Sequence, residues 1–286
     1  MSADANRPRL PRTAALGPGR GDQPRLLIDA PAGSAEIHLF GAHLTAWTPR
    51  GGRPVVFVSQ RARFDGETAI RGGIPLCLPW FTAGPRGTSR PKHGWARIMN
   101  WSLRSVESTS GGGVRALLSL EHDALVALYE VTAGETLTMS LSLRNTGTGP
   151  RPVEAALHTY LAVHDVTACV LTGLEGAEYA EEGASGGVQD GPLRIAGPID
   201  RIYRSEAPVR VTDPGNRRAI VVRGTGSPTT VVWNPWSRGA SRIADLADDE
   251  FASFLCVETA AVRQDAPVLG PGSSWSMSAT ITTEAL

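Results

Sequence analysis

The chain has 286 residues, and its 28 lysine and arginine side chains are balanced by 28 aspartate and glutamate side chains. This formal net charge of zero gives no reason to expect binding to nucleic acid or to an anionic membrane surface, so any anion-binding site must be local. The composition, 41% hydrophobic and 20% charged, is ordinary for a globular protein, and no apolar run reaches the roughly 18 residues of a transmembrane helix.

The first 22 residues are rich in proline, glycine and arginine, and we expect a flexible tail there, followed by a single domain over residues 23–286. The tail has no apolar run of signal-peptide length. The three cysteines, Cys77, Cys169 and Cys256, lie far apart, which predicts reduced, buried thiols in a cytoplasmic protein. No histidine or cysteine spacing indicates a zinc site.

Short stretches that alternate apolar and polar residues recur along the chain. In the clearest, residues 137–144, Leu and Met alternate with Thr, Ser and Arg after a predicted hairpin turn at Gly134–Glu135, which indicates a strand with one buried face. Only residues 239–252 favour a short helix. The sequence therefore predicts an all-β fold, a large antiparallel β-sandwich. The other predicted strands cover residues 24–30, 34–40, 43–49, 54–60, 114–122, 125–135, 152–163, 168–174, 218–224, 229–236, 252–262 and 275–284.

Residues 70–97 interrupt the strand pattern with paired glycines, prolines and tryptophans, which indicates stiff loops. Arg71 and Arg97 lie in these loops, and the planar guanidinium group suits a carboxylate or a phosphate, although a surface salt bridge is the commoner role of a single arginine. Trp80 and Trp95 fit either the core or a wall against a sugar ring.

His158 lies in the predicted strand 152–163, on the same face as Tyr160 and His164. A histidine on a concave sheet is a natural proton carrier near neutral pH. The alternative is a polar contact on a solvated sheet face.

Glu258 is the only charged residue between Glu250 and Arg263, and it shares a strand face with Phe254 and Cys256. A carboxylate among apolar neighbours has a raised pKa and becomes a usable base near neutral pH. The alternative is a structural carboxylate paired with an arginine. Neither a Gly-x-Gly-x-x-Gly motif nor a P-loop is present, so no nucleotide cofactor is expected.

The chain resembles the D-hexose-6-phosphate mutarotases, or glucose-6-phosphate 1-epimerases, of the galactose mutarotase-like superfamily. The resemblance covers roughly residues 60–262, and its motifs occur in the family's order. They are IRGGIPLCLPWF, HGWAR, EAALHTYLAV, TGLEG, IDRIY, VVWNPW and CVETAAV, and LGPGSSW continues the resemblance towards the C-terminus. The resemblance implies a large antiparallel supersandwich, in agreement with the strand pattern.

The resemblance also implies the roles of individual residues. His158 and Glu258 correspond to the family's acid/base pair. The residues implied to contact the substrate are Arg71, His93, Arg97 and Asp200, with the two arginines gripping the phosphate. The implied reaction interconverts the anomers of a hexose 6-phosphate, with glucose 6-phosphate as the expected substrate, without metal or cofactor. We expect a monomer that uses this small molecule and neither nucleic acid nor membrane.

Two departures affect the outer part of the expected site. RIMNW follows HGWA where the family often has Leu-Pro before Trp, and residues 82–91 form a long basic loop. Two alternatives stay open: a mutarotase for an unphosphorylated sugar, and a non-catalytic carbohydrate-binding module on the same sandwich. The second would need the aromatic and arginine side chains but not His158 together with Glu258.

Overall fold

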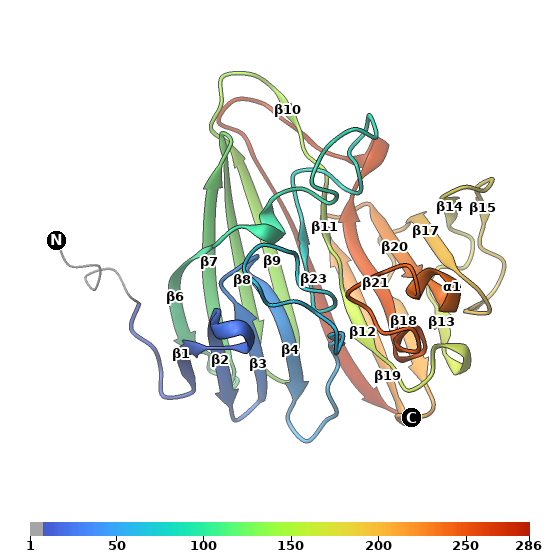
Figure 1. Ribbon diagram of the computed structural model, residues 1–286, viewed down its shortest axis with the longest axis horizontal. Helices are drawn as coiled ribbons and strands as arrows, with labels where there is room; N and C mark the ends of the chain where they lie inside the picture. The colour runs from blue at the N-terminus through green and yellow to red at the C-terminus, as the bar shows by residue number, and fades with distance from the viewer. Residues whose placement is uncertain (1–7) are drawn as a thin grey trace.

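The computed structural model describes residues 8–286, and most of that chain forms β-strands with short connections (Figure 1). Every strand pairing is antiparallel, as predicted. The strands form sheets of nine, eight, four and two strands. Within the described residues, no helix has the length and apolar character needed to cross a membrane.

The largest sheet has nine strands, and it carries the clearest alternation in the sequence. On β9 (Leu137–Asn145) the four predicted apolar residues, two of which are Leu137 and Leu143, are buried, while the residues between them are partly or fully exposed. Gly134 joins this strand to its hairpin partner as predicted. In spatial order the strands are β16 (Leu193–Arg194), β13 (Val170–Thr172), β18 (Val209–Asp213), β19 (Arg218–Thr225), β23 (Ser274–Ala285), β9 (Leu137–Asn145), β8 (Leu125–Ala133), β7 (Val114–His122) and β6 (Ser102–Ser108).

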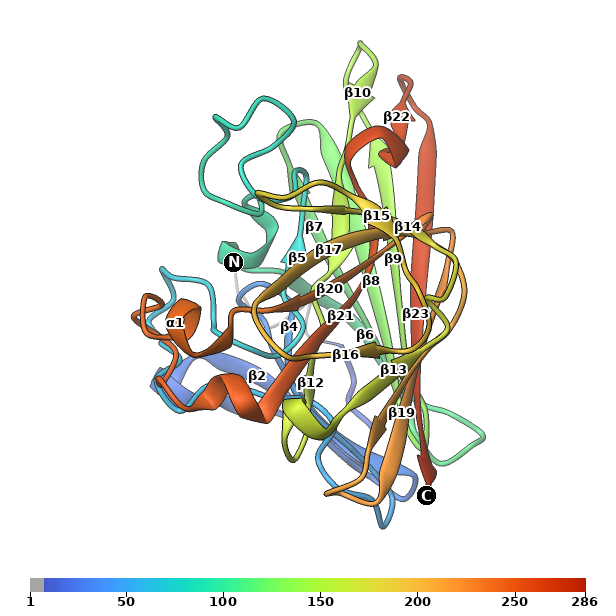
Figure 2. The same cartoon turned by 90° about the vertical axis from the view of Figure 1, so that its right-hand side faces the viewer.

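The eight-stranded sheet passes in front of the nine-stranded sheet in Figure 2. Its central strand β21 (Phe254–Ala261) is buried at every position, because both of its faces are covered. The spatial order is β15 (Gly187–Val188), β14 (Glu178–Glu181), β17 (Ile199–Arg204), β20 (Thr229–Asn234), β21 (Phe254–Ala261), β11 (Ala155–Leu157) and β5 (Leu76–Cys77), and β12 (Tyr160–Ala162) also pairs with β21.

The remaining elements are small. A four-stranded sheet contains β1 (Ala14–Pro18), β2 (Pro24–Ala30), β3 (Gly33–His38) and β4 (His43–Pro49), and a two-stranded sheet pairs β10 (Arg151–Pro152) with β22 (Val268–Leu269). The helical elements are α1 (Trp236–Ala240) and the 3₁₀ turns η1 (Arg20–Asp22), η2 (Ala96–Ile98), η3 (Val166–Ala168), η4 (Glu250–Ser253) and η5 (Arg263–Asp265). The helix expected within residues 239–252 does not form: α1 ends at Ala240, and residues 241–249 are turns and irregular chain before η4.

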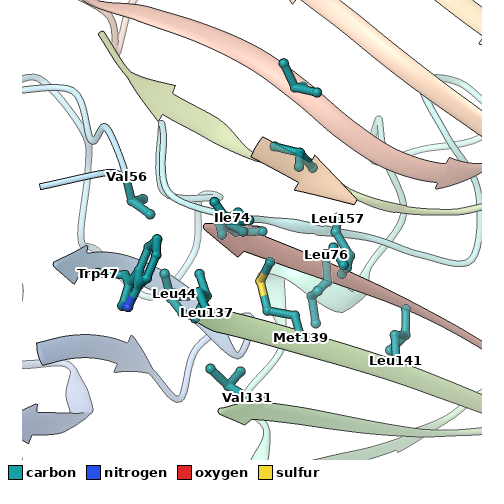
Figure 3. Close-up of a cluster of buried hydrophobic side chains, with 14 of the residues drawn as sticks. Leu44, Trp47, Val56, Ile74, Leu76, Val131, Leu137, Met139, Leu141 and Leu157 are labelled. Atoms are coloured by element: carbon teal, nitrogen blue, oxygen red, sulfur yellow. The ribbon is translucent and has the colours of Figure 1, made fainter. Parts of the chain in front are cut away.

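The three larger sheets share one cluster of buried apolar side chains (Figure 3). Trp47 comes from β4, Leu141 from β9 and Leu157 from β11, and all three are fully buried. This shared core holds the eight-stranded sheet, which carries the predicted acid/base residues, against the other two.

Three further sequence-based predictions require correction. The predicted tail is too long, because Ala14–Pro18 pairs with β2; residues 1–7 lie outside the described part of the chain. The predicted strand 54–60 makes only isolated bridges, through Val56 and Val58. The predicted strand 152–163 is broken at His158, for a reason given below.

Core packing should dominate stability. Replacing Leu141, which is fully buried, with alanine should lower the free energy of unfolding by about 2–5 kcal/mol through lost burial and a residual cavity. Leu128 on the neighbouring strand is 41% exposed, and Leu128→Ala is the matched control, with an expected change within about 0.5 kcal/mol. Denaturant unfolding measures both, and equal losses in the two variants would contradict the packing described.

Candidate active site

A cavity of about 680 Å³ lies over β20 and β21, and the loop after β5 forms one of its walls. It brings together residues from distant parts of the sequence. The lining residues are Arg71, Phe81, Thr82, Ala83, Gly84, Pro85, Gly87, Arg90, Lys92, His93, His158, Tyr160, Glu182, Asp200, Val231, Trp233, Glu258 and Arg263. Of the six residues predicted for the site, five line this cavity and Arg97 does not.

His158 and Glu258 meet in this cavity. Nε2 of His158 lies 3.3 Å from Oε1 of Glu258, and the two residues are only 8% and 1% exposed. Nδ1 of His158 and Oε2 of Glu258 are buried and have no hydrogen-bond partner among the described residues. Two groups that can carry a proton are therefore held in contact, and each has a second polar atom without a hydrogen-bond partner. This arrangement is suited to acid/base chemistry.

A local break in the strand presents His158 to the cavity. Thr159 N–H donates a hydrogen bond to the carbonyl oxygen of Leu157 at 2.9 Å, which makes a three-residue γ-turn centred on His158. The backbone N–H of His158 donates instead to Pro75 at 3.1 Å. The predicted shared face holds for Tyr160, which lines the cavity together with His158, but not for His164, which is exposed elsewhere.

Burial controls the protonation of the pair. Loss of solvation raises the pKa of Glu258 well above its ordinary value, and the negative charge of Asp200 acts in the same direction. Loss of solvation lowers the pKa of His158 well below 6.5, helped by His93 and nearby arginines. The favoured form of the pair without substrate is thus a protonated carboxyl group beside a neutral imidazole, with one proton between them.

Aromatic rings fix the orientation of the His158 imidazole. The Tyr160 ring stacks on it at 4.9 Å with an interplanar angle of 11°, and Trp233 meets it edge-on at 6.0 Å. Trp233, from the WNPW motif, lines the cavity. Trp80 and Trp95 are absent from the lining: Trp95 is buried against His122, and Trp80 donates its indole N–H to Pro91.

His93 approaches the His158 ring at 5.6 Å, in the predicted wall of the site. Its Nδ1 lies 3.3 Å from Sγ of Cys77, and its backbone N–H donates to Thr82 at 2.6 Å, which closes the loop 82–91. Burial lowers the pKa of His93 to about 3, so this imidazole is neutral at neutral pH.

Arg71 lines the cavity but is already paired there. Its Nε lies 3.0 Å from the Asp245 carboxylate, and its Nη1 donates to the Tyr160 hydroxyl at 3.3 Å. The following residues, Gly72 and Gly73, have positive φ, and a Cβ at either would collide with neighbouring backbone. The two glycines are therefore required by the backbone conformation and the packing at this point of the chain.

Arg97 lies outside the cavity lining, so the predicted arginine pair is not assembled on the cavity wall. Its Nη2 donates to the backbone carbonyl of Lys92 at 2.7 Å, and its buried Nε has no partner among the described residues. Arg97 thus supports the backbone of a lining residue instead of lining the cavity itself.

The positive charge at the rim comes from residues that the sequence had not singled out. Arg90 and Lys92, at the end of the loop 82–91, both line the cavity. Within the described residues, neither has a carboxylate at ion-pair distance. Lys92 is the only lysine in the chain, and this was the sequence feature that could have pointed to it as a site residue. Arg263 also lines the cavity, where Glu154 and Thr82 hold its side chain.

Buried Glu154 anchors the base of the loop 82–91. Its two carboxylate oxygens accept the backbone N–H groups of Phe81 and Arg263, both at 2.9 Å. The loop closes further along, where Trp80 donates to Pro91 at 2.8 Å. These bonds hold the basic end of the loop in place over the cavity.

Asp200, predicted to contact the substrate, lines the cavity, and it pairs across the sheet with Trp233. Burial and the neighbouring Glu182 raise the pKa of Asp200 to about 7. Near neutral pH this side chain can therefore accept or donate a hydrogen bond to a sugar hydroxyl.

The structure also brings together three residues that their sequence spacing did not connect. One ligand-type atom each of His158, Cys256 and Glu258 lies within 4.8 Å of the other two. All three cysteines are free and buried, as predicted. The cluster could not be found from spacing because His158 comes from a different part of the chain from the other two.

The aldose 1-epimerase family model matches residues 24–282. A Cenchrus ciliaris protein named "Putative glucose-6-phosphate 1-epimerase" is 33% identical over 265 residues, which cover 84% of this chain and 78% of that protein. An Escherichia coli K12 protein of the same name is 32% identical, with 82% of each chain covered. A crystal structure of a "putative mutarotase" from Salmonella typhimurium has a TM-score of 0.89 at 26% identity and covers 98% of this chain and 96% of that one. The chain therefore belongs to the aldose 1-epimerase family, and the resemblance found in its motifs is confirmed.

Proposed function

We propose that this protein interconverts the α and β anomers of a hexose 6-phosphate, with glucose 6-phosphate as the preferred substrate. The observation that carries the proposal is the buried contact of 3.3 Å between His158 and Glu258 at a cavity whose rim is cationic. Family membership supports the reaction, and the names of the two relatives described above support the sugar phosphate.

The reaction opens the hemiacetal ring and closes it on the other face of C1. Glu258, as the carboxylate, takes the proton of the C1 hydroxyl, and His158, as the imidazolium, gives a proton to the ring oxygen. The C1–O5 bond breaks and the open-chain aldehyde forms. After rotation about the C1–C2 bond, the reverse transfers restore both groups and give the other anomer. No proton is gained or lost in the cycle.

The electrostatics of the pair favour ring opening. The reactive form, Glu258 carboxylate with His158 imidazolium, is related to the neutral form by one proton shift across a 3.3 Å contact. Ring opening returns the pair to the neutral form, which burial stabilises. Lowering the pH adds a second proton to the pair and raising the pH removes its only one, so both changes stop the reaction.

The rest of the cavity suits a sugar that carries a phosphate. Trp233 offers an apolar surface to the ring, and Asp200 offers a hydrogen-bond partner to a hydroxyl. The positive charge of Arg71 is largely compensated by Asp245, whereas Arg90 and Lys92 have no such partner within the described chain. We therefore assign the main phosphate contacts to Arg90 and Lys92, with Arg71 beside them and Arg97 positioning the Lys92 backbone.

The phosphate assignment predicts that removal of either basic side chain lowers kcat/KM for the phosphorylated sugar only. Arg90→Ala and Lys92→Ala should each lower kcat/KM for glucose 6-phosphate by about 10- to 100-fold, because each removes a charged hydrogen bond worth about 1.5–3 kcal/mol. Turnover of unphosphorylated glucose should be unchanged. Arg86 is exposed in the same loop and does not line the cavity, so Arg86→Ala is the matched control. Equal losses for glucose and glucose 6-phosphate would favour a mutarotase for neutral sugars.

The acid/base assignment predicts that the rate losses caused by replacing His158 and Glu258 are not additive. His158→Ala and Glu258→Gln should each reduce enzymatic anomerisation of pure α-glucose 6-phosphate by about 10²–10⁴-fold, measured by NMR after subtraction of the spontaneous rate. The double variant should be little worse than either single variant, because both groups act in one transition state. Binding of the sugar phosphate should persist in all three.

The control for this pair is His164→Ala, which removes an exposed histidine from the same segment and should leave the rate unchanged. Near-parental turnover in His158→Ala or in Glu258→Gln would leave a carbohydrate-binding protein as the better interpretation.

A further inference from the structure

Cys256 has no part in the proposed reaction, yet its thiol lies beside both reacting groups. It precedes Glu258 by two residues on β21, so the two side chains leave the strand on the same face. Its Sγ, a ring nitrogen of His158 and a carboxylate oxygen of Glu258 all lie within 4.8 Å of one another. All three residues are buried, with Cys256 fully so.

These distances suit a single tetrahedral cation. Zinc bonds of about 2.0 Å to nitrogen and oxygen and about 2.3 Å to sulfur place neighbouring donor atoms about 3.3–3.5 Å apart. The separation between Nε2 of His158 and Oε1 of Glu258 is already 3.3 Å. The sulfur has to approach by at most about 1.5 Å to reach the separation that such bonds require.

The donor atoms are also available. Nε2 of His158 and Oε1 of Glu258 contact each other, and the second atom of each group, Nδ1 and Oε2, is buried with no hydrogen-bond partner in the described chain. Cys256 forms no disulfide. A bound cation would therefore displace only the contact within the His158–Glu258 pair.

The donor set selects the kind of cation. Thiolate and imidazole ligands suit soft or borderline ions such as Zn²⁺ and Cd²⁺, whereas Mg²⁺ and Ca²⁺ need several oxygen ligands. The cationic rim, with Arg90 and Lys92, further disfavours ions that are held by charge alone.

We propose that His158, Cys256 and Glu258 form an inhibitory site for a soft divalent cation, Zn²⁺ or Cd²⁺, with the fourth coordination position facing the cavity. The inhibitory part rests on the proposed function, because a cation on His158 and Glu258 occupies the lone pairs that move protons. The binding part does not depend on it.

The charges balance in this complex. Binding converts the Cys256 thiol to a thiolate and removes the one proton of the His158–Glu258 pair, so two protons are released for one M²⁺ bound. The two new negative charges neutralise the cation, and no uncompensated charge is left in the buried site.

Cadmium titration of the chelator-treated protein tests the site directly, because a Cd²⁺–thiolate bond gives an ultraviolet charge-transfer band. We expect one Cd²⁺ per chain with this band in the parent protein and in Cys169→Ser, a control that removes another buried free thiol. Cys256→Ser and Cys256→Ala should lose the band and bind Cd²⁺ at least about 100-fold more weakly, since removal of even an outer hydrogen-bond partner costs about 10–100-fold. Circular dichroism checks that each variant is folded, and two replacements are used so that one misfolded variant does not decide the result.

Activity supplies the second readout. Zn²⁺ should inhibit anomerisation in competition with glucose 6-phosphate, excess chelator should restore the rate in full, and Mg²⁺ should have no effect. Absence of the band in the parent, or its persistence in both Cys256 variants, would overturn the metal site. Inactivity of the metal-free parent towards every hexose phosphate would instead overturn the proposed function and leave the binding result standing.

Discussion

The candidate site depends on a carboxyl group and an imidazole held in contact away from water. In water, Glu258 would be ionised and His158 would titrate near 6.5; in the protein, burial moves their pKa values in opposite directions. Because burial favours the neutral form of each group, the pair holds one transferable proton. Anomerisation needs such a pair, since one proton leaves the C1 hydroxyl while another is given to the ring oxygen. The surrounding charges act on the same pair: Asp200 disfavours the carboxylate, and Arg71 disfavours the imidazolium.

The fold produces this contact through irregularities in otherwise regular sheets. Glu258 lies on a fully buried central strand, so its position is fixed by core packing. His158 reaches it because a γ-turn breaks the neighbouring strand, and the segment after Arg71 accepts the displaced backbone hydrogen bonds through the carbonyl oxygens of Gly73 and Pro75. A buried Glu154 then ties the basic loop over the cavity. Rigid strands thus position the His158–Glu258 pair, while anchored loops carry the basic groups at the rim of the cavity.

The sequence alone predicted those features that depend on residues close together in the chain. The alternation on residues 137–144 predicted a half-buried strand and its hairpin, because period-two burial depends only on neighbouring residues. The isolation of Glu258 among apolar residues predicted a buried carboxyl group. The positions of five of the six predicted site residues at one cavity came from family motifs, which encode the common fold.

What the sequence did not reveal depends on contacts between distant segments. Arg97 and Lys92 are close in the chain, yet only Lys92 lines the cavity, because the Arg97 side chain turns to the Lys92 carbonyl. The strand formed by Ala14–Pro18 was hidden by a composition rich in proline and glycine, which tertiary pairing overrides. The sequence predicted Cys256 only as a buried thiol, because its proximity to His158 arises from the fold.

We expect the buried pair to hold a single transferable proton, with His158 neutral in the protein without substrate. The most direct measurement is a ¹⁵N NMR titration of the His158 imidazole, assigned by comparison with His158→Ala. A group whose pKa is lowered by burial stays neutral as the pH falls through its ordinary value. We expect neutral-imidazole shifts at pH 6.5, with protonation of His158 only well below that value. An imidazolium at neutral pH, or a titration centred near pH 6.5, would contradict it.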